Sequence, residues 1–258
     1  MAPNTVYLTT GANRGIGFGI VSISLQHANT TVVVTVRNET TDVAPFKALS
    51  KADNSDLIIT YLSISTTSTR EIETSHRAFA GYLKARDIEM IDVLVANAGI
   101  DTPLSSIAND FCANTLGPIA LYQTGLPFLR ASTIAKFVII GSILGSIGAV
   151  MPRASTLSCG ASKDAVHYSA KRIHDEEEMI VLTIHPGGSS KLNYYSIGVP
   201  APPMTVEQSA EGVLTKVRCL SFRGTCSPTM KTLKEIDTAT KEMTSGAFAG
   251  FGGAEVPW

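Results

Sequence analysis

The sequence lacks several features that would point to particular classes of protein. Its 258 residues contain no apolar run approaching the length of a membrane-spanning helix, about 18 residues or more. The N-terminus has no basic stretch before an apolar segment, so we expect no secretory signal peptide. Charged residues make up only 17%, and 21 Lys and Arg nearly balance 22 Asp and Glu. The net charge of −1 gives no electrostatic reason to expect nucleic acid or an anionic membrane as a partner.

Cysteine is also scarce. The four cysteines (Cys112, Cys159, Cys219 and Cys226) form neither a CxxC pair nor a Cys/His pattern with metal-ligand spacing. We therefore expect no metal site, and we interpret the thiols other than Cys159 as simple reduced cysteines of a cytoplasmic protein. A chain of this length buries enough core to need neither a disulfide nor a structural metal.

The sequence does contain a regular alternation of short β-branched runs and longer helical patterns. The expected strands are 6–10, 31–37, 57–62, 91–96, 137–141, 180–184 and a seventh near 247–251. The expected helices are 15–28, 68–86, 107–131, 158–178 and 206–220. Continuously apolar strands are typical of a parallel sheet covered by helices on both faces. This predicts an α/β fold, a single doubly wound, Rossmann-type parallel sheet of about seven strands, in one domain over residues 1–258.

The first expected strand leads into a glycine-rich segment, TGANRGIG, at 10–17. Glycines permit a tight turn and close backbone approach, and a helix beginning at Gly15 would point free N–H groups at a pyrophosphate. The segment follows a predicted strand and opens a predicted helix, as such a motif requires. We therefore predict a cofactor-binding loop formed by Gly11, Asn13, Arg14, Gly15, Ile16 and Gly17.

The spacing TGxxxGxG resembles that of the short-chain dehydrogenase/reductase family, and other motifs of that family follow in order. ANAG at 96–99 resembles its NNAG motif, GASK at 160–163 resembles the end of its YxxxK motif, and Pro186-Gly187 resembles its PG motif. Both ends of the chain, VYLTTGANRGIG and TKEMTSG…VPW, are similar to the fungal norsolorinic acid ketoreductase-like branch. The resemblance implies that the cofactor also contacts Asn97, Ala98, Gly99, Lys163, Pro186 and Gly187. By analogy, it implies a homo-oligomer, a dimer or tetramer, built on the helices 107–131 and 158–178.

The end of the second expected strand favours NADP(H) over NAD(H). An acidic residue there would bind the ribose 2′-hydroxyl, whereas an arginine accommodates a 2′-phosphate. This chain has Arg37-Asn38 at that point and Arg14 in the glycine-rich loop. Guanidinium groups bind phosphate by charge and by bidentate geometry.

The resemblance also implies a catalytic set, of which one member is replaced. Asn114, Ser142 and Lys163 match the asparagine, serine and lysine of the family, but the tyrosine position, four residues before Lys163, holds Cys159. The i, i+4 spacing keeps Cys159 and Lys163 on one helix face. A thiol has a free pKa of about 8.5, lowered by a neighbouring ammonium, and suits a base or nucleophile better than a proton donor. Cys159 can also be interpreted as a small buried core residue.

Other candidate replacements for the tyrosine are weaker. Tyr168 is expected on the opposite face of the helix, and His167 is expected to be a packing residue. Tyr194 and Tyr195 follow the PG motif in a segment that covers the nicotinamide in this family, where lid packing is the simpler interpretation. Lys191 stands where the family usually has threonine.

Three functions remain open from the sequence. The first is an NADPH-dependent reductase of secondary metabolism acting on a hydrophobic polyketide-like or aromatic carbonyl. The second is a non-redox cyclase, isomerase or dehydratase, and the third is a non-catalytic NADP(H)-binding protein. The segments 101–106, 144–157 and 191–204, expected to line the substrate site, are apolar and lightly charged. They predict a small hydrophobic substrate.

Overall fold

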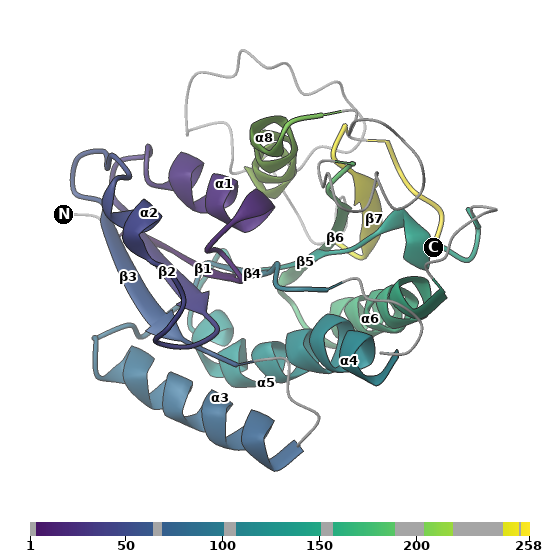
Figure 1. The fold of residues 1–258 in the computed structure, drawn as a ribbon, viewed down its shortest axis with the longest axis horizontal. Coiled ribbons are helices and arrows are strands. Elements are labelled where there is room, and N and C mark those ends of the chain that lie inside the picture. Colours follow the sequence, from purple (N-terminus) through teal and green to yellow (C-terminus); the bar gives the residue numbers. More distant parts are fainter. Residues whose placement is uncertain are drawn as a thin grey trace.

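The structure is a computed structural model that describes residues 4–63, 69–100, 107–150, 157–188, 204–218, 245–252 and 254–258. Within these ranges one parallel sheet has the strand order β3-β2-β1-β4-β5-β6-β7 (Figure 1). The strands are β1 (Thr5–Thr10), β2 (Thr30–Val36), β3 (Asp56–Tyr61), β4 (Val93–Ala96), β5 (Lys136–Ile140), β6 (Ile180–His185) and β7 (Ala247–Gly250). The order reverses between β1 and β4, where doubly wound sheets bind ligands. The predicted α/β fold is confirmed.

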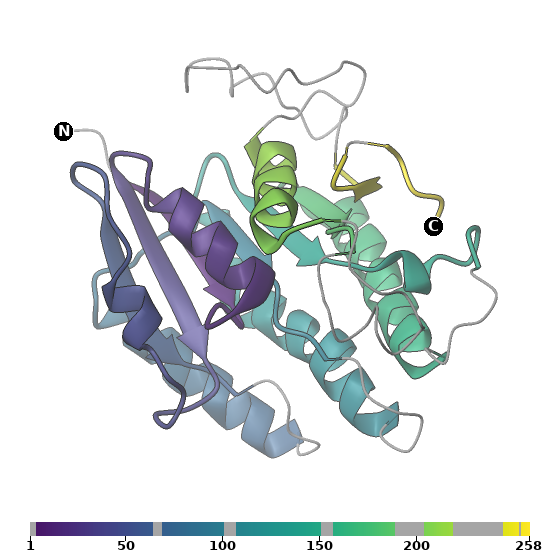
Figure 2. The ribbon, with the colours of Figure 1, turned by 45° about the horizontal axis from the view of Figure 1, so that its top comes forward.

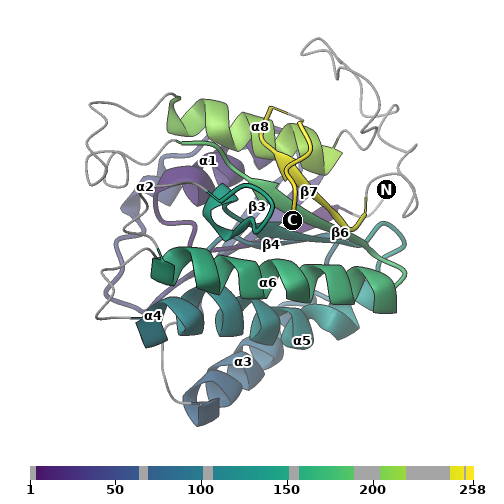
Figure 3. The same cartoon turned by 90° about the vertical axis from the view of Figure 1, so that its right-hand side faces the viewer.

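Helices cover both faces of the sheet. They are α1 (Gly15–Ser24), α2 (Ala44–Lys47), α3 (Thr69–Lys84), α4 (Ile107–Phe111), α5 (Gly117–Arg130), α6 (Leu157–Glu176) and α8 (Val206–Arg218). Figures 1 and 3 show α1 and α8 on one face and α3, α4, α5 and α6 on the other. None of the helices in the described ranges is long and apolar enough to span a membrane.

The core has two layers, because each strand is apolar on both sides. One layer packs α3, α5 and α6 against the sheet and includes Phe79, Leu121, Phe137 and Val166. The other packs α1 and α8 and includes Ile20 and Val213, among others. This double burial explains why the strands read as continuous apolar runs rather than as alternating ones.

The expected helix over residues 107–131 is wrong in its middle. The structure has α4, then a π-helical turn at Cys112–Leu116, then α5. The π turn adds one wide turn without breaking the apolar periodicity of the segment, so the sequence pattern does not reveal the π turn. Such π turns within helices are frequent at functional sites.

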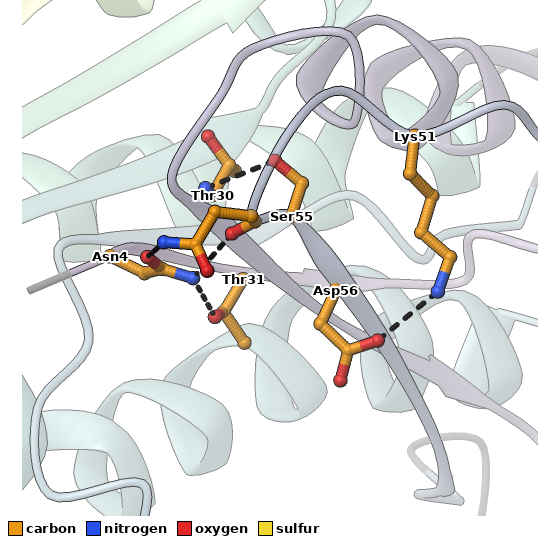
Figure 4. Close-up of polar contacts among 7 residues, drawn as sticks. Asn4, Thr30, Thr31, Lys51, Ser55 and Asp56 are labelled. Carbon is orange, nitrogen blue, oxygen red and sulfur yellow. Dashed lines mark hydrogen bonds and ion pairs between the residues drawn. The ribbon is translucent and has the colours of Figure 1, made fainter.

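Polar contacts join the amino-terminal ends of β1, β2 and β3, at the end of the sheet opposite the glycine-rich loop (Figure 4). The Asn4 amide donates to Thr31 Oγ1 (3.2 Å), Thr30 N–H donates to Ser55 Oγ (3.2 Å), and Lys51 pairs with Asp56. These contacts stabilise the sheet and lie away from the site, because the predicted site residues follow the carboxyl ends of the strands.

Candidate active site

The glycine-rich loop after β1 and the loop after β4 are joined by hydrogen bonds and close backbone contact. Asn97 Nδ2 donates to the backbone oxygens of Thr10 (2.9 Å) and Gly11 (3.2 Å), and Ala98 N–H donates to Thr10 Oγ1 (3.1 Å). A Cβ on Gly11, whose φ is +62°, would lie 2.8 Å from Ala98 Cα, and a Cβ on Gly17 would collide with Asn97 Nδ2. Glycine is needed at both positions because the two loops occupy the space of a side chain.

Helix α1 begins at Gly15 with its first N–H groups uncapped. Arg14 precedes it with extended backbone, no side chain caps the helix, and its first turn has no acidic residue. Gly15 has φ +59°, and no other part of the described chain lies within 4 Å of its Cβ position. Asn13 and Ile16 are half-buried beside it, and Arg14 is exposed. An open helix N-terminus of this kind fits the pyrophosphate of a dinucleotide.

Arg37 and Asn38 follow β2 beside the glycine-rich loop. The Gly11 N–H donates to the backbone oxygen of Thr35 (3.2 Å), which brings the ends of β1 and β2 together. Asn38 Oδ1 accepts hydrogen bonds from two threonine hydroxyls of the next turn. Arg37 and Arg14 are exposed, and neither forms an ion pair within the described chain. Both guanidinium groups are therefore available to a phosphate.

Lys163 joins the loop after β4 to the end of β5. Its side chain is buried, and its Nζ donates to the backbone oxygen of Ile140 (2.7 Å). A Cβ on Gly99 would lie 2.9 Å from Asn114 Oδ1 and 3.4 Å from Lys163 Nζ. Burial lowers the pKa of Lys163, and the charge of Cys159 opposes that shift. Three predicted site residues from α6, the π turn and the β4 loop therefore meet at one place.

Asn114 lies in the π turn and is completely buried. Its Nδ2 donates to the backbone oxygen of Ile100 (2.8 Å), and its Oδ1 accepts from the Ile100 N–H (2.9 Å). The amide thus holds the loop after β4 against the π turn. This contact fixes the position of the loop after β4 next to Lys163.

Cys159 is 5% exposed on the face of α6 that carries the lysine. Ser162 Oγ donates to the Cys159 carbonyl oxygen (2.9 Å) and accepts from Asn114 Nδ2 (3.0 Å). One turn earlier, Ser158 Oγ donates to Asp110 Oδ2 (2.6 Å). These polar contacts hold the first turns of α6 against α4 and the π turn, and so determine where the thiol lies.

Ser142 follows β5 and begins a 3-10 turn, Ile143–Gly145. Its Oγ accepts from the Leu144 N–H (3.2 Å), which leaves the hydroxyl hydrogen free for another acceptor. A Cβ on Gly145 would lie 2.7 Å from the α6 backbone, and a Cβ on Gly160 would lie 2.7 Å from the Leu144 oxygen. The two glycines allow the serine turn to pack directly on the helix that carries Cys159.

Pro186 and Gly187 follow β6 and lie beside α8 and the residues after β7. The Pro186 oxygen accepts from Ser209 Oγ (2.5 Å). Gly187 has φ +77°, and its Cβ would collide with the Met204 side chain and lie 2.8 Å from Phe251. Glycine is therefore needed at this turn.

Several predicted residues lie outside the described ranges, including Lys191, Tyr194, Tyr195, Cys219 and Cys226. So do the segment 101–106, residues 151–156 of the segment 144–157, and residues 191–203 of the segment 191–204. Tyr168 is 68% exposed on α6, which agrees with its predicted orientation away from the site. The described residues contain no cluster of His, Cys, Asp or Glu suited to a metal ion.

Sequence reasoning missed Thr10 and Ser162 as links between site loops. Each is a buried hydroxyl next to a predicted site residue, Gly11 or Lys163. Thr10 Oγ1 accepts from two N–H groups of the loop after β4, and Ser162 Oγ accepts from Asn114 in the π turn while donating within α6. A polar residue at an expected core position was the available signal, but only the fold identifies its partners.

Comparison with known proteins identifies the family. Residues 5–190 match the family model described as short chain dehydrogenase. The chain is 31% identical to norsolorinic acid ketoreductase of Aspergillus parasiticus, over 98% of this chain and 91% of that protein. It is 33% identical to the short chain dehydrogenase gsfK of Penicillium aethiopicum, over 99% and 100%.

Solved structures show the same fold. The NADPH-bound carbonyl reductase from chicken fatty liver superposes over the whole of both chains with a TM-score of 0.75 at 23% identity. The motifs, the sheet order and these matches lead to one conclusion: the chain belongs to the short-chain dehydrogenase family, in its fungal norsolorinic acid ketoreductase-like branch.

Proposed function

We propose that this protein is an NADP(H)-dependent reductase of secondary metabolism that acts on a carbonyl of a hydrophobic, polyketide-like or aromatic substrate. The observation that carries the proposal is the convergence of Asn114, Cys159 and Lys163, with the Ser142 turn packed on the same helix. The similarity to norsolorinic acid ketoreductases supports the reaction class.

The cofactor proposal rests on the open start of α1 and on two exposed arginines that form no ion pair with any described residue. Gly15 leaves open space at the start of α1 where a pyrophosphate would lie, and Gly11 and Gly17 let the loop after β4 pack against the glycine-rich loop. Arg14 and Arg37 are exposed and would flank the ribose. NADPH would supply the hydride for the reduction. Lys163 would hold the ribose hydroxyls with its buried ammonium.

The remaining work for the protein is to orient the carbonyl and to hold a proton near its oxygen. Ser142 offers a hydroxyl hydrogen, because its oxygen already accepts from Leu144 N–H. Cys159 occupies the position from which the family's tyrosine donates, and Lys163 lies on the same face, one turn later. We infer that the Cys159 thiol and the Lys163 ammonium hold the proton that the carbonyl oxygen receives.

A second candidate is a non-redox enzyme, such as an isomerase, cyclase or dehydratase, on the same scaffold. The buried Cys159 beside the Lys163 ammonium favours it, because such a thiol suits a base or nucleophile better than an acid. The third possibility, NADP(H) binding without turnover, needs the cofactor loop alone.

Consumption of NADPH with a panel of aryl ketones and hydroxylated aromatic polyketides tests the proposal. We expect oxidation of NADPH that is coupled to formation of the alcohol. A product of unchanged mass, formed without NADPH oxidation, would establish the second candidate. Tight NADPH binding with no product from any member of the panel would contradict both enzymatic proposals.

The proposal includes a homo-oligomer. Ile107, Leu116 and Leu157 are 45%, 46% and 68% exposed, on α4, the π turn and α6. Apolar side chains on these neighbouring elements support pairing through the helices named from the family resemblance. Light scattering of the purified protein is expected to give a dimer or tetramer, and a monomer would contradict this part.

A further inference from the structure

The first two backbone N–H groups of the serine turn each point at a histidine ring. Ser142 N–H donates to His167 Nε2 (3.4 Å), and Ile143 N–H donates to His185 Nδ1 (3.3 Å). His167 comes from α6 and His185 from the end of β6, so three separate elements meet here. A Cβ on Gly141 would lie 2.6 Å from His167 Nε2, so glycine before the serine admits the ring.

Both rings are in the protonation state that this contact requires. Burial lowers the pKa of His167 to about 3, with the Lys163 charge acting in the same direction, and burial lowers the pKa of His185 to about 4. Each ring is therefore neutral near pH 7 and has one nitrogen that can accept a hydrogen bond. For His167, acceptance at Nε2 places the ring proton on Nδ1, which is buried and has no hydrogen-bond partner of normal geometry among the described residues.

The C-terminal end of the chain closes over the same place. Figures 1, 2 and 3 show it beside the segment that follows β5. The Trp258 ring packs edge-on against His167 (6.1 Å between centroids, 72°), and the Trp258 oxygen accepts from Gly148 N–H (2.8 Å). Ser146 Oγ donates to the oxygen of Pro257 (2.5 Å).

The fit of this end depends on a further glycine and on an aromatic stack. A Cβ on Gly148 would lie 2.9 Å from Pro257 Cβ, so the tail approaches the loop closely. The His167 ring also packs on Phe248 of β7, with centroids 4.4 Å apart, and Phe248 packs in turn on Trp258, with centroids 5.6 Å apart. His167 therefore has little freedom to turn away from the serine turn.

We propose that His167 and His185 are positioning residues that hold the Ser142 turn through two consecutive backbone N–H groups, with Trp258 holding His167 in place. The proposal deepens the proposed function, and it rests on carbonyl reduction at this site. It makes Trp258 part of the support of the Ser142 turn. It also gives both histidines a role beyond filling the core.

Paired substitutions separate the hydrogen-bond acceptor from the ring. His167→Phe and His185→Phe keep a ring and remove the acceptor, whereas His167→Gln and His185→Asn place an amide oxygen near the lost nitrogen. Net hydrogen bonds are worth about 0.5–1.5 kcal/mol, so we expect each Phe variant to lower kcat by about 3- to 10-fold. The amide variants should restore most of kcat, and all four should bind NADPH as the wild type does.

Tyr168→Phe is the matched control, because this residue is the exposed neighbour of His167 on α6. It should leave kcat unchanged. If folded Phe variants keep the kcat of the wild type, the proposal is overturned. The same conclusion follows if the Phe and amide variants lose kcat equally, because ring packing alone would then explain the effect. A wild-type protein that reduces no carbonyl contradicts the proposed function instead.

Hydrogen exchange tests the contact without turnover and needs only folded protein. We expect the amides of the segment 142–148 to exchange at least several-fold faster in Trp258→Leu, which removes the aromatic support of His167, and in whichever Phe variants fold. Exchange in Tyr168→Phe should match the wild type. Unchanged exchange in Trp258→Leu and in the folded Phe variants would overturn the proposal.

Discussion

The Nζ of Lys163 lies 2.7 Å from the backbone oxygen of Ile140, so a buried ammonium joins the middle of α6 to the end of β5. It also lies next to the backbone of Gly99 in the loop after β4. The cation is thus shared between the serine turn's strand and the loop expected to meet the cofactor.

Replacement of this lysine should weaken the cofactor complex. Lys163→Met keeps the length of the side chain but removes the ammonium expected to reach the ribose hydroxyls. We expect the Kd for NADPH to rise by about 10-fold or more, as for loss of a charged hydrogen bond. Lys171→Met, at an exposed position of the same helix, is the control. Equal affinities of the two variants in calorimetric titration would contradict the assigned role.

The two arginines should determine the choice between NADPH and NADH. Arg37→Ala should raise the Kd for NADPH by about 10- to 100-fold and change the Kd for NADH little, because only NADPH carries the 2′-phosphate. Arg14→Ala should act in the same direction. Lys51→Ala removes a cation near the amino-terminal ends of the strands and should change the Kd of neither cofactor. An equal rise in the Kd for NADPH and for NADH would show that the guanidinium group does not contact the 2′-phosphate.

Glycines in the cofactor loop should tolerate no side chain, for two different reasons. Gly17→Ala puts a Cβ 2.9 Å from Ala12 Cα and against Asn97, so the two loops must move apart. Gly15→Val fills open space where the pyrophosphate is expected and forces a branched residue to φ +59°. Both should abolish NADPH binding in a fluorescence titration.

Gly81→Ala is the control for these glycine variants. Its Cβ meets nothing within 4 Å on the exposed side of α3, and alanine in a helix should stabilise the fold by about 0.5–1 kcal/mol. Wild-type NADPH affinity in Gly17→Ala would show that the loop does not hold the phosphates.

Cys159→Tyr tests the chemistry of the replaced position. If the site reduces carbonyls as its family does, a phenol one turn before Lys163 should raise the rate by about 10²-fold or more. If the native reaction is not a reduction, the same change should lower it, by filling substrate space or by removing the thiol.

Cys159→Ala and Cys159→Ser distinguish those two causes. When the thiol takes part in the chemistry, both variants lose activity, whereas a cysteine that only makes room can be replaced by alanine without loss. A Cys159→Tyr variant that binds NADPH but reduces no ketone would count against the reductase and in favour of the non-redox enzyme.

Buried histidines should make the fold sensitive to acid. Burial lowers the pKa of His76 and His185 to about 4 and of His167 to about 3, against 6.5 for the unperturbed group. Below pH 6.5 the unfolded chain binds protons that the folded chain does not. The free energy of unfolding is therefore highest above pH 6.5 and falls as the pH drops towards about 4.

His76→Asn isolates one of these contributions. The amide can keep the contact with Thr124 Oγ1 (2.9 Å) but does not titrate. Between about pH 7.5 and about pH 4.5 the variant should lose less stability than the wild type, by an amount on the order of 2 kcal/mol. Urea unfolding at the two pH values measures this. Parallel losses would mean that His76 is not buried in its neutral form.

The order and type of the main elements could be read from local pattern. The run 31–37 predicts a strand that the structure has at Thr30–Val36, and the segment 10–17 predicts the turn into α1 that the structure contains. Both readings succeed because apolar β-branched runs and glycine spacing carry their physical cause within a few residues. Cys159 and Lys163 were placed on one face of α6 for the same reason.

What only the tertiary structure decided concerns contacts between distant residues. The π turn around Asn114 interrupts a helix whose periodicity looked continuous, and it depends on partners in α6 and in the loop after β4. His167 was expected to be a packing residue. In the structure His167 and His185 each accept an N–H from the serine turn, 25 and 42 residues away. Trp258 lies next to the segment after Ser142 because β7 pairs with β6 and directs the residues that follow it towards that segment. Such pairings arise from the packing of separate elements, so no local pattern in the sequence specifies them.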